Sequence, residues 1–170
     1  MPTNEQLDSY FEKLFESGKY SPAFYGVYFK ETGNEKDKAG ARRGHNVGPM
    51  QLDLRYPKAF GVDPLDPYQN IKGGLDYLVK LYDKFGDEKK AIAAYNWGET
   101  NLRSHIRKYG DDWESKLPKS VQRYIFDVHV RNPEFDKAGL LGQQEMETWG
   151  DLMPRSADQY IKSLSTQDLP

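Results

Sequence analysis

Apolar side chains recur at helical spacing along most of the first 130 residues. The first such series follows Thr3 and Gln6, which fit a capping box, and it ends at Gly18. Its apolar positions are Leu7, Tyr10, Phe11, Leu14 and Phe15. The pattern predicts an amphipathic helix that buries one face and exposes the other.

A second helix is expected to begin at Ser21 and Pro22, which suit a cap and a first helical position, and to end at Gly33. Its sequence, AFYGVYF, is apolar nearly all round, so we expect it to be buried on most sides. Residues 34–47 are polar, contain two glycines and have no apolar period, which predicts a surface loop. An irregular stretch with three prolines follows the segment GPMQLD.

Four more helices are predicted beyond this stretch. The first carries Ile71, Leu75, Leu78, Val79 and Tyr82 on one face; Asp87 caps the second; the third carries Leu102, Ile106 and Tyr109; and Pro118 opens the fourth, with Val121, Tyr124, Ile125 and Val128. Ser156 could cap a further short helix. Period-2 alternation is scarce, so the fold class is predicted as mainly α: one helical domain over residues 1–130, with residues 131–170 as an extension packed on it or trailing from it.

Composition narrows the possible functions. The chain has 24 basic and 26 acidic residues among 170, for a net charge of −2, so no basic excess is present to bind a nucleic-acid backbone. Zero cysteines exclude disulfides and thiolate chemistry. No apolar run is long enough to span a bilayer, and the polar start MPTNEQLDSY lacks the apolar core of a signal peptide. Export would therefore need another device, or a leader that this sequence does not include.

Three short segments occur in a telling order: ETG at residues 31–33, GPMQLD at 48–53 and AYNWG at 94–98. Together they resemble the soluble lytic transglycosylases and goose-type lysozymes, which share Glu-Ser, Gly-Leu-Met-Gln and Ala-Tyr-Asn segments. An aromatic residue on a late helix after a proline completes the pattern, and LPKSVQRYI places it at Tyr124. The resemblance covers roughly residues 5–128. It implies a lysozyme-like helical fold with a substrate cleft, acting on peptidoglycan between N-acetylmuramic acid and N-acetylglucosamine.

Two glutamates compete for the role of the catalytic acid that the resemblance implies. Glu16 lies in the closer literal match, Glu-Ser, but only one predicted helix precedes it, whereas two precede Glu31. Glu31 is 20 residues before Gln51, near the family separation, and Glu16 is 35 residues before it. Glu31 is therefore the catalytic candidate. At the end of an apolar helix its carboxyl would be desolvated, which raises the pKa and keeps a proton for the glycosidic oxygen.

The fate of the cleaved bond depends on a second carboxylate. A lytic transglycosylase, as the resemblance implies, uses the same glutamate as base on the muramyl 6-hydroxyl and closes a 1,6-anhydro ring, whereas a lysozyme activates water. Asp53 matches a goose-type aspartate, but a second goose-type acid aligns with Arg42. This loss favours the anhydro-forming reaction. Asp53 could instead be structural, capping a turn or pairing with Arg55.

The remaining motif positions are predicted to bind substrate. Gly48 would let the backbone approach a sugar, and Met50 and Gln51 would supply an apolar contact and amide hydrogen bonds. Pro49 replaces the usual leucine and removes a backbone donor. Tyr95 and Asn96 would supply a hydroxyl and an amide beside the acid, and the Tyr124 hydroxyl is expected near Glu31. Trp97 replaces a small residue and could either stack on a sugar or pack in the interior.

No cofactor or metal is expected, because His45, His105 and His129 lack ligand spacing. The predicted partner is the peptidoglycan strand, met in the periplasm or outside the cell, with no nucleic acid and no integral membrane segment. A phage lysis enzyme or a virion-associated protein would fit, with virion or envelope partners. Two alternatives stay open: a hydrolytic muramidase that uses Asp53 to position water, and a non-catalytic glycan-binding or structural module, favoured by Arg42, Pro49 and Trp97.

Overall fold

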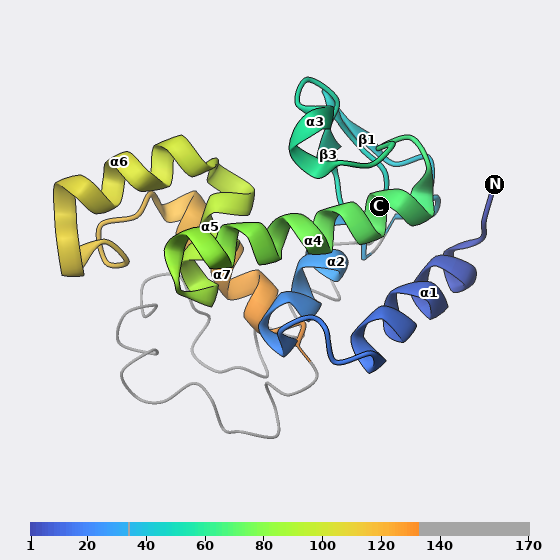
Figure 1. Ribbon diagram of the computed structural model, residues 1–170, viewed down its shortest axis with the longest axis horizontal. Coiled ribbons are helices and arrows are strands. Elements are labelled where there is room, and N and C mark those ends of the chain that lie inside the picture. Colours follow the sequence, from blue (N-terminus) through green and yellow to red (C-terminus); the bar gives the residue numbers. More distant parts are fainter. Residues whose placement is uncertain (34, 133–170) are drawn as a thin grey trace.

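The structure is a computed structural model that describes residues 1–33 and 35–132. Over these residues the chain is mainly helical, as predicted, and a small sheet lies at one side of the helices (Figure 1). The α-helices are α1 (Asn4–Glu16), α2 (Tyr25–Thr32), α3 (Pro57–Phe60), α4 (Pro67–Phe85), α5 (Glu88–Trp97), α6 (Glu99–Tyr109) and α7 (Lys119–His129). Two 3₁₀ turns, Pro22–Phe24 and Gly110–Asp112, precede α2 and follow α6.

The predicted helix boundaries are largely confirmed. The Thr3 hydroxyl accepts from the Gln6 N–H and the Gln6 side chain accepts in return from Thr3, so the capping box is present. Asp87 caps α5 by accepting from the N–H of Lys90 at 2.8 Å. The helix predicted from Ser156 and the extension beyond residue 132 lie outside the described residues.

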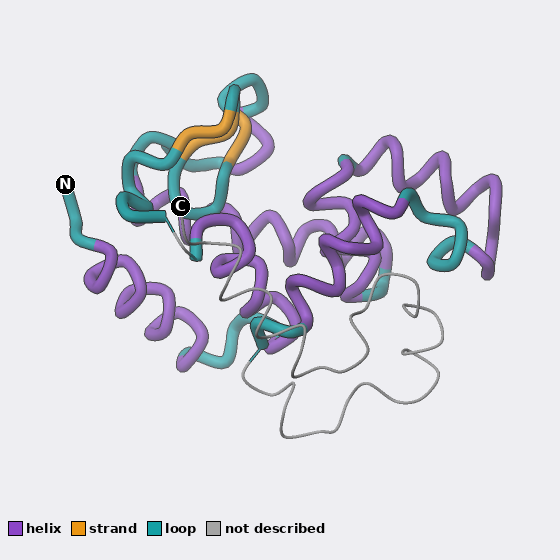
Figure 2. The backbone as a smooth tube through the Cα atoms, turned by 180° about the vertical axis from the view of Figure 1, so that it is seen from behind, coloured by secondary structure: helices purple, strands orange, loops and turns teal. Residues whose placement is uncertain are grey.

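The expected loop over residues 34–47 is only partly a loop. Strands β1 (Arg42–Arg43), β2 (Asn46–Val47) and β3 (Leu52–Asp53) form an antiparallel sheet in the order β1-β2-β3 (Figure 2). Arg43 pairs with Asn46, and Val47 pairs with Leu52. Strands of two residues are too short to show an alternating pattern, which is why the sequence did not reveal them.

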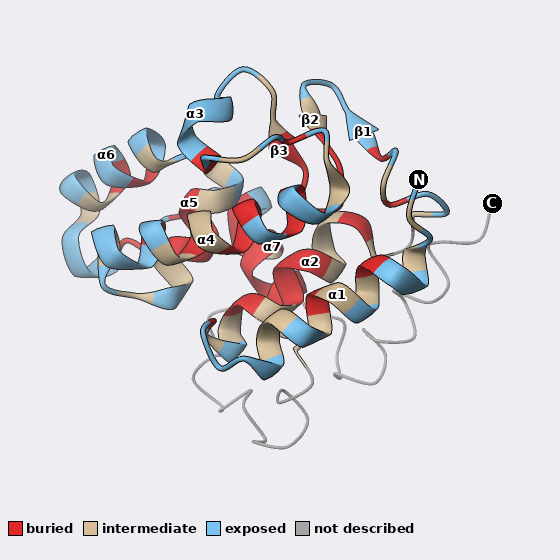
Figure 3. Cartoon of the chain, turned by 45° about the vertical axis from the view of Figure 1, so that its right-hand side comes forward, coloured by how far each residue is buried: buried red, intermediate tan, exposed pale blue. Residues whose placement is uncertain are grey.

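Helix α4 packs on α5 and α1 (Figure 3), and its buried face differs slightly from the predicted one. Leu75, Leu78 and Leu81 are fully buried, whereas Tyr82, which was assigned to that face, is 42% exposed. Leu81 and Leu78 are three positions apart and so share one side of the helix, which turns the buried face towards Leu81 and leaves Tyr82 at its edge. The helix begins at Pro67, and Asp66 caps it by accepting from the N–H of Gln69 at 2.9 Å.

Helices α2 and α7 pack directly on each other, and this contact positions the candidate acid. A Cβ atom added to Gly26 in α2 would lie 1.8 Å from the carbonyl oxygen of Val128 in α7. Only glycine permits the two backbones to approach so closely at this point. The approach brings the end of α2, with Glu31, alongside Tyr124 of α7.

Candidate active site

Glu31 lies near the end of α2, and its carboxyl group is tied to α7. The Tyr124 hydroxyl donates a hydrogen bond to Oε1 of Glu31, so the predicted proximity of these two side chains is observed. The next residue, Thr32, is buried and donates from its hydroxyl to the carbonyl oxygen of Pro49 at 2.8 Å. The end of α2 is thus joined both to α7 and to the GPMQLD segment.

Burial raises the pKa of the Glu31 carboxyl above its ordinary value. The Tyr124 hydrogen bond and the positive charges of Arg43 and Lys30 act in the opposite direction. Each of those cations is paired with another carboxylate: Lys30 Nζ lies 2.8 Å from Asp127 Oδ2, and Arg43 Nη2 lies 2.9 Å from Glu35 Oε1. Because both charges are partly neutralised elsewhere, desolvation prevails and favours the protonated acid.

Tyr95 of α5 is hydrogen-bonded to the GPMQLD segment. Its hydroxyl donates to the carbonyl oxygen of Met50 at 2.7 Å. Burial raises the pKa of Tyr95 well above its ordinary value, and the nearby charge of Glu31 adds to that rise. The tyrosine is therefore a neutral hydrogen-bond donor that is within the electrostatic influence of the candidate acid.

Two predicted substrate contacts are not on the surface of the site. The Met50 side chain is 0% exposed and packs against Gly74, so the prediction that it lines the cleft wall is wrong; its carbonyl oxygen is the group that takes part, through Tyr95. Gly48 is also buried, with φ +73°, and an added Cβ would lie 2.5 Å from Nδ2 of Asn70. The closely packed neighbour of this glycine is a protein side chain, where the sequence suggested a sugar.

Asn70, in α4, holds this segment in place and was not identified from the sequence. It is 0% exposed, accepts from the Met50 N–H at 2.8 Å, and donates to the carbonyl oxygens of Val47 and Pro64 at 2.8 and 2.9 Å. The side-chain oxygen and both side-chain N–H groups of this buried asparagine are thus hydrogen-bonded to main-chain groups. A polar residue in the first turn of a helix reads as exposed, so the sequence carried no signal for it.

Gln51 has the strained backbone that often marks a functional site. It is the single non-glycine with positive φ in the described parts of the chain, at 51°. Its Nε2 donates to the Gly48 carbonyl oxygen at 2.9 Å, while its buried Oε1 has no hydrogen-bond partner there. An acceptor left unpaired in the protein is suited to a donor supplied by a ligand.

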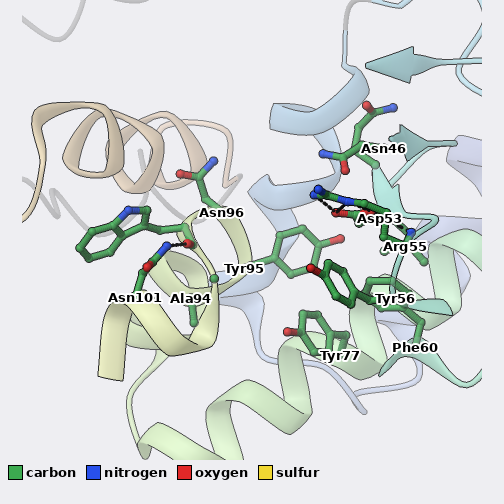
Figure 4. Close-up of a pocket in the computed structure, with 14 residues that line it drawn as sticks. Asn46, Asp53, Arg55, Tyr56, Phe60, Tyr77, Ala94, Tyr95, Asn96 and Asn101 are labelled. Carbon is green, nitrogen blue, oxygen red and sulfur yellow. Dashed lines mark hydrogen bonds and ion pairs between the residues drawn. The ribbon is translucent and has the colours of Figure 1, made fainter. Parts of the chain in front are cut away.

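A pocket of about 470 Å³ lies between the sheet and helices α3 to α6 (Figure 4). Four of the predicted residues line it: Gln51, Asp53, Tyr95 and Asn96. Gly48, Met50, Glu31 and Tyr124 do not. Residues that the sequence reasoning missed also line it, namely Asn46, Tyr56, Phe60, Tyr77 and Asn101. Tyr95 relates the pocket to the candidate acid, because it lines the pocket and its pKa is influenced by the charge of Glu31.

Asp53 is paired with Arg55, one of the two alternatives that the sequence left open. Its Oδ1 accepts from the Arg55 N–H at 2.9 Å, and its Oδ2 lies 2.6 Å from Nη2 of Arg55. These hydrogen bonds lower the pKa of Asp53, so its carboxylate is charged and already engaged. Trp97 also lines the pocket, and its partly buried ring packs edge-on against His105 with centroids 5.3 Å apart.

Among the described residues, no group of three or more histidine, aspartate or glutamate side chains could hold a metal ion. Within the same part of the chain, each helix is too short or too polar to cross a membrane.

Comparison with known proteins supports the motif reading. Residues 42–117 match the family described as "Transglycosylase SLT domain". A protein of Enterobacteria phage PRD1 named "Transglycosylase" is 30% identical over 124 residues, which are 71% of this chain and 44% of the phage protein. The chain thus corresponds to less than half of that relative's length. No solved structure matches it. The resemblance to the lytic transglycosylases that the motifs predicted is confirmed by these matches, which include residues 42–117 against the transglycosylase SLT domain.

Proposed function

We propose that the chain is a peptidoglycan lytic transglycosylase that cuts the β-1,4 bond between N-acetylmuramic acid and N-acetylglucosamine, with Glu31 as acid and then base. The observation that carries this proposal is the partly buried carboxyl of Glu31, whose pKa burial raises and which accepts a hydrogen bond from Tyr124. The transglycosylase domain and the name of the phage relative support the substrate class.

The reaction needs a single carboxyl group and no water. Protonated Glu31 gives its proton to the oxygen of the departing N-acetylglucosamine as the bond from C1 to that oxygen breaks. The resulting carboxylate takes the proton of the muramyl 6-hydroxyl, whose oxygen bonds to C1 and closes the 1,6-anhydro ring. Glu31 ends the cycle protonated, as it began. Tyr124 donates to the carboxylate when it is charged, which stabilises the form of Glu31 that results from proton transfer to the departing sugar.

Two features favour ring closure over hydrolysis. Asp53 is the single acidic residue among those that line the described pocket, and Arg55 already engages it through its main chain and its guanidinium. Arg42, which aligns with the other goose-type acid, is an exposed cation on β1. Neither position therefore supplies a carboxylate that is free to activate water. A hydrolytic muramidase and a non-catalytic glycan-binding or virion structural module are the alternatives that the experiment must reject.

The test is digestion of purified sacculi followed by mass spectrometry of the soluble products. We expect muropeptides with 1,6-anhydromuramyl ends; reducing ends without anhydro sugars would establish a hydrolase, and binding without release would establish a non-catalytic module. Glu31→Gln should abolish product release. Glu16→Gln is the matched control, because Glu16 is an exposed glutamate that also ends a helix, and it should leave release unchanged.

The site of action follows from the substrate. Peptidoglycan lies outside the cytoplasmic membrane, so the protein would act in the periplasm, outside the cell or on an entering virion. The phage origin of the relative favours a phage lysis or virion role. Detection of the chain in purified virions, or only in infected cells, would separate these two, and would show whether virion or envelope partners exist.

A further inference from the structure

One side of the pocket is formed by three aromatic rings that no motif predicts: Tyr56, Phe60 and Tyr77, here called the aromatic wall (Figure 4). Tyr77 of α4 lies in the middle of a series. Its ring packs edge-on against Phe60 with centroids 5.1 Å apart, and it is tilted against the Tyr95 ring with centroids 5.9 Å apart. The aromatic wall therefore continues directly from Tyr95, whose pKa is influenced by the charge of Glu31.

Tyr77 brings a polar group to this wall. The side chain is half-buried, and in the described residues its hydroxyl has no hydrogen-bond partner. Buried or partly buried tyrosines usually find a partner for this group. The hydroxyl at the pocket lining is therefore suited to a donor or acceptor on a ligand.

Tyr56 forms the exposed end of the wall and is held there. Its side chain is 60% exposed, which is unusual for a large aromatic residue that lines a pocket. Its N–H donates to the carbonyl oxygen of Asp53 at 3.0 Å, and the Arg55 guanidinium lies 5.5 Å from the centre of its ring. The pairing of Asp53 with Arg55 thus stabilises the turn that presents Tyr56.

The charge of the pocket indicates the class of ligand. Asp53 and Arg55 are the charged residues among those that line it, and they neutralise each other through their ion pair. The other polar lining groups are neutral, and the amides of Asn46 and Asn96 have no protein partner in the described part of the chain. Aromatic faces combined with neutral amides and a hydroxyl suit an uncharged ring that has both C–H and polar groups.

We propose that the aromatic wall is a sugar-binding subsite that takes an N-acetylated pyranose ring of the glycan strand, one face on Tyr56 and its polar edge on the Tyr77 hydroxyl. This inference rests on the proposed function and adds residues that bind the glycan strand at a position remote from Glu31. The competing occupant is the stem peptide, and a probe that contains sugar without peptide separates the two.

The experiment is calorimetric titration of chitohexaose, a peptide-free chain of N-acetylglucosamine, into full-length Glu31→Gln protein. Removing the hydroxyl by Tyr77→Phe in this background should weaken binding about three- to tenfold, the equivalent of one hydrogen bond. Tyr56→Ala should weaken it about fivefold through lost apolar contact. Tyr82→Phe is the matched control, since Tyr82 is on the same helix, is 42% exposed and does not line the pocket; its affinity should be unchanged.

Each result decides the inference separately from the proposed function. Unchanged affinity in both Tyr77→Phe and Tyr56→Ala, or no binding of chitohexaose by the parent, would overturn the inference even if wild-type protein releases anhydro-muropeptides. Weaker affinity in the two variants supports it even if sacculi digestion yields no anhydro sugars. Thermal unfolding midpoints verify that each variant is folded. Because Tyr56 is exposed, its variant remains a decisive test if Tyr77→Phe is unstable.

Discussion

Asn70→Ala is expected to be among the most destabilising single substitutions in the described domain. The change leaves three buried main-chain groups, on Val47, Met50 and Pro64, without the partner they now have at 2.8–2.9 Å. An unsatisfied buried group costs about 1–3 kcal/mol. Water that enters the new space would recover part of this, so we expect a loss of about 4 kcal/mol, a large share of the roughly 5–15 kcal/mol that stabilises a typical domain.

Urea unfolding followed by far-ultraviolet circular dichroism would measure this loss. At about 2–4 °C per kcal/mol, the melting temperature should fall by roughly 8–16 °C. Asn101→Ala is the matched control, because Asn101 is exposed and makes one hydrogen bond, to the Trp97 carbonyl oxygen at 2.8 Å; it should cost under about 1 kcal/mol. A loss in Asn70→Ala no larger than in this control would refute the reasoning that Asn70 holds the GPMQLD segment.

Three further predictions concern the carboxyl groups. Burial raises the pKa of Glu31 in the folded state, so the stabilising contribution of this group is present at acid pH and is lost as the pH rises through the folded-state pKa. Glu31→Gln should therefore unfold at a higher urea concentration than wild type at neutral pH, and the difference between their midpoints should disappear under acid conditions. A difference that stays constant with pH would contradict the burial argument. Tyr124→Phe removes a hydrogen bond that lowers the Glu31 pKa, so the alkaline fall of the activity profile should shift to higher pH while turnover drops about tenfold; an unshifted profile would disprove the coupling. Asp53→Asn weakens the link to Arg55 and should reduce affinity for sacculi about threefold, yet the products should still carry anhydro ends; loss of all cleavage would assign Asp53 a chemical role.

The sequence predicted those parts of the site that depend on helix order and motif spacing. Glu31 was preferred over Glu16 because two helices precede it, and the structure brings it to Tyr124 across the contact of α2 with α7. Helix periodicity also predicted most core residues, because the buried face of a helix follows from the local spacing of its apolar residues.

The parts that were missed depend on contacts between distant segments. Met50 was expected on the cleft wall because a motif identifies a position without telling which of its atoms are used; here the carbonyl is used and the side chain is in the core. Phe60 and Tyr77 are 17 positions apart and pack together only because α3 packs on α4. No local pattern reports such a meeting, nor the buried role of Asn70.

Pro49 removes a backbone donor, as the sequence indicated, but its place in a turn also gives it a stabilising role. The Gln51 N–H donates to the Gly48 carbonyl oxygen at 3.0 Å, which makes Pro49 the second residue of a four-residue turn, where proline is favoured. Its carbonyl oxygen meanwhile accepts from Thr32. A proline at a compatible position restricts the unfolded chain and adds about 0.4–1 kcal/mol to stability. The substitution of the family's leucine thus lowers the entropy that must be lost before the segment joining Glu31 to the pocket can form.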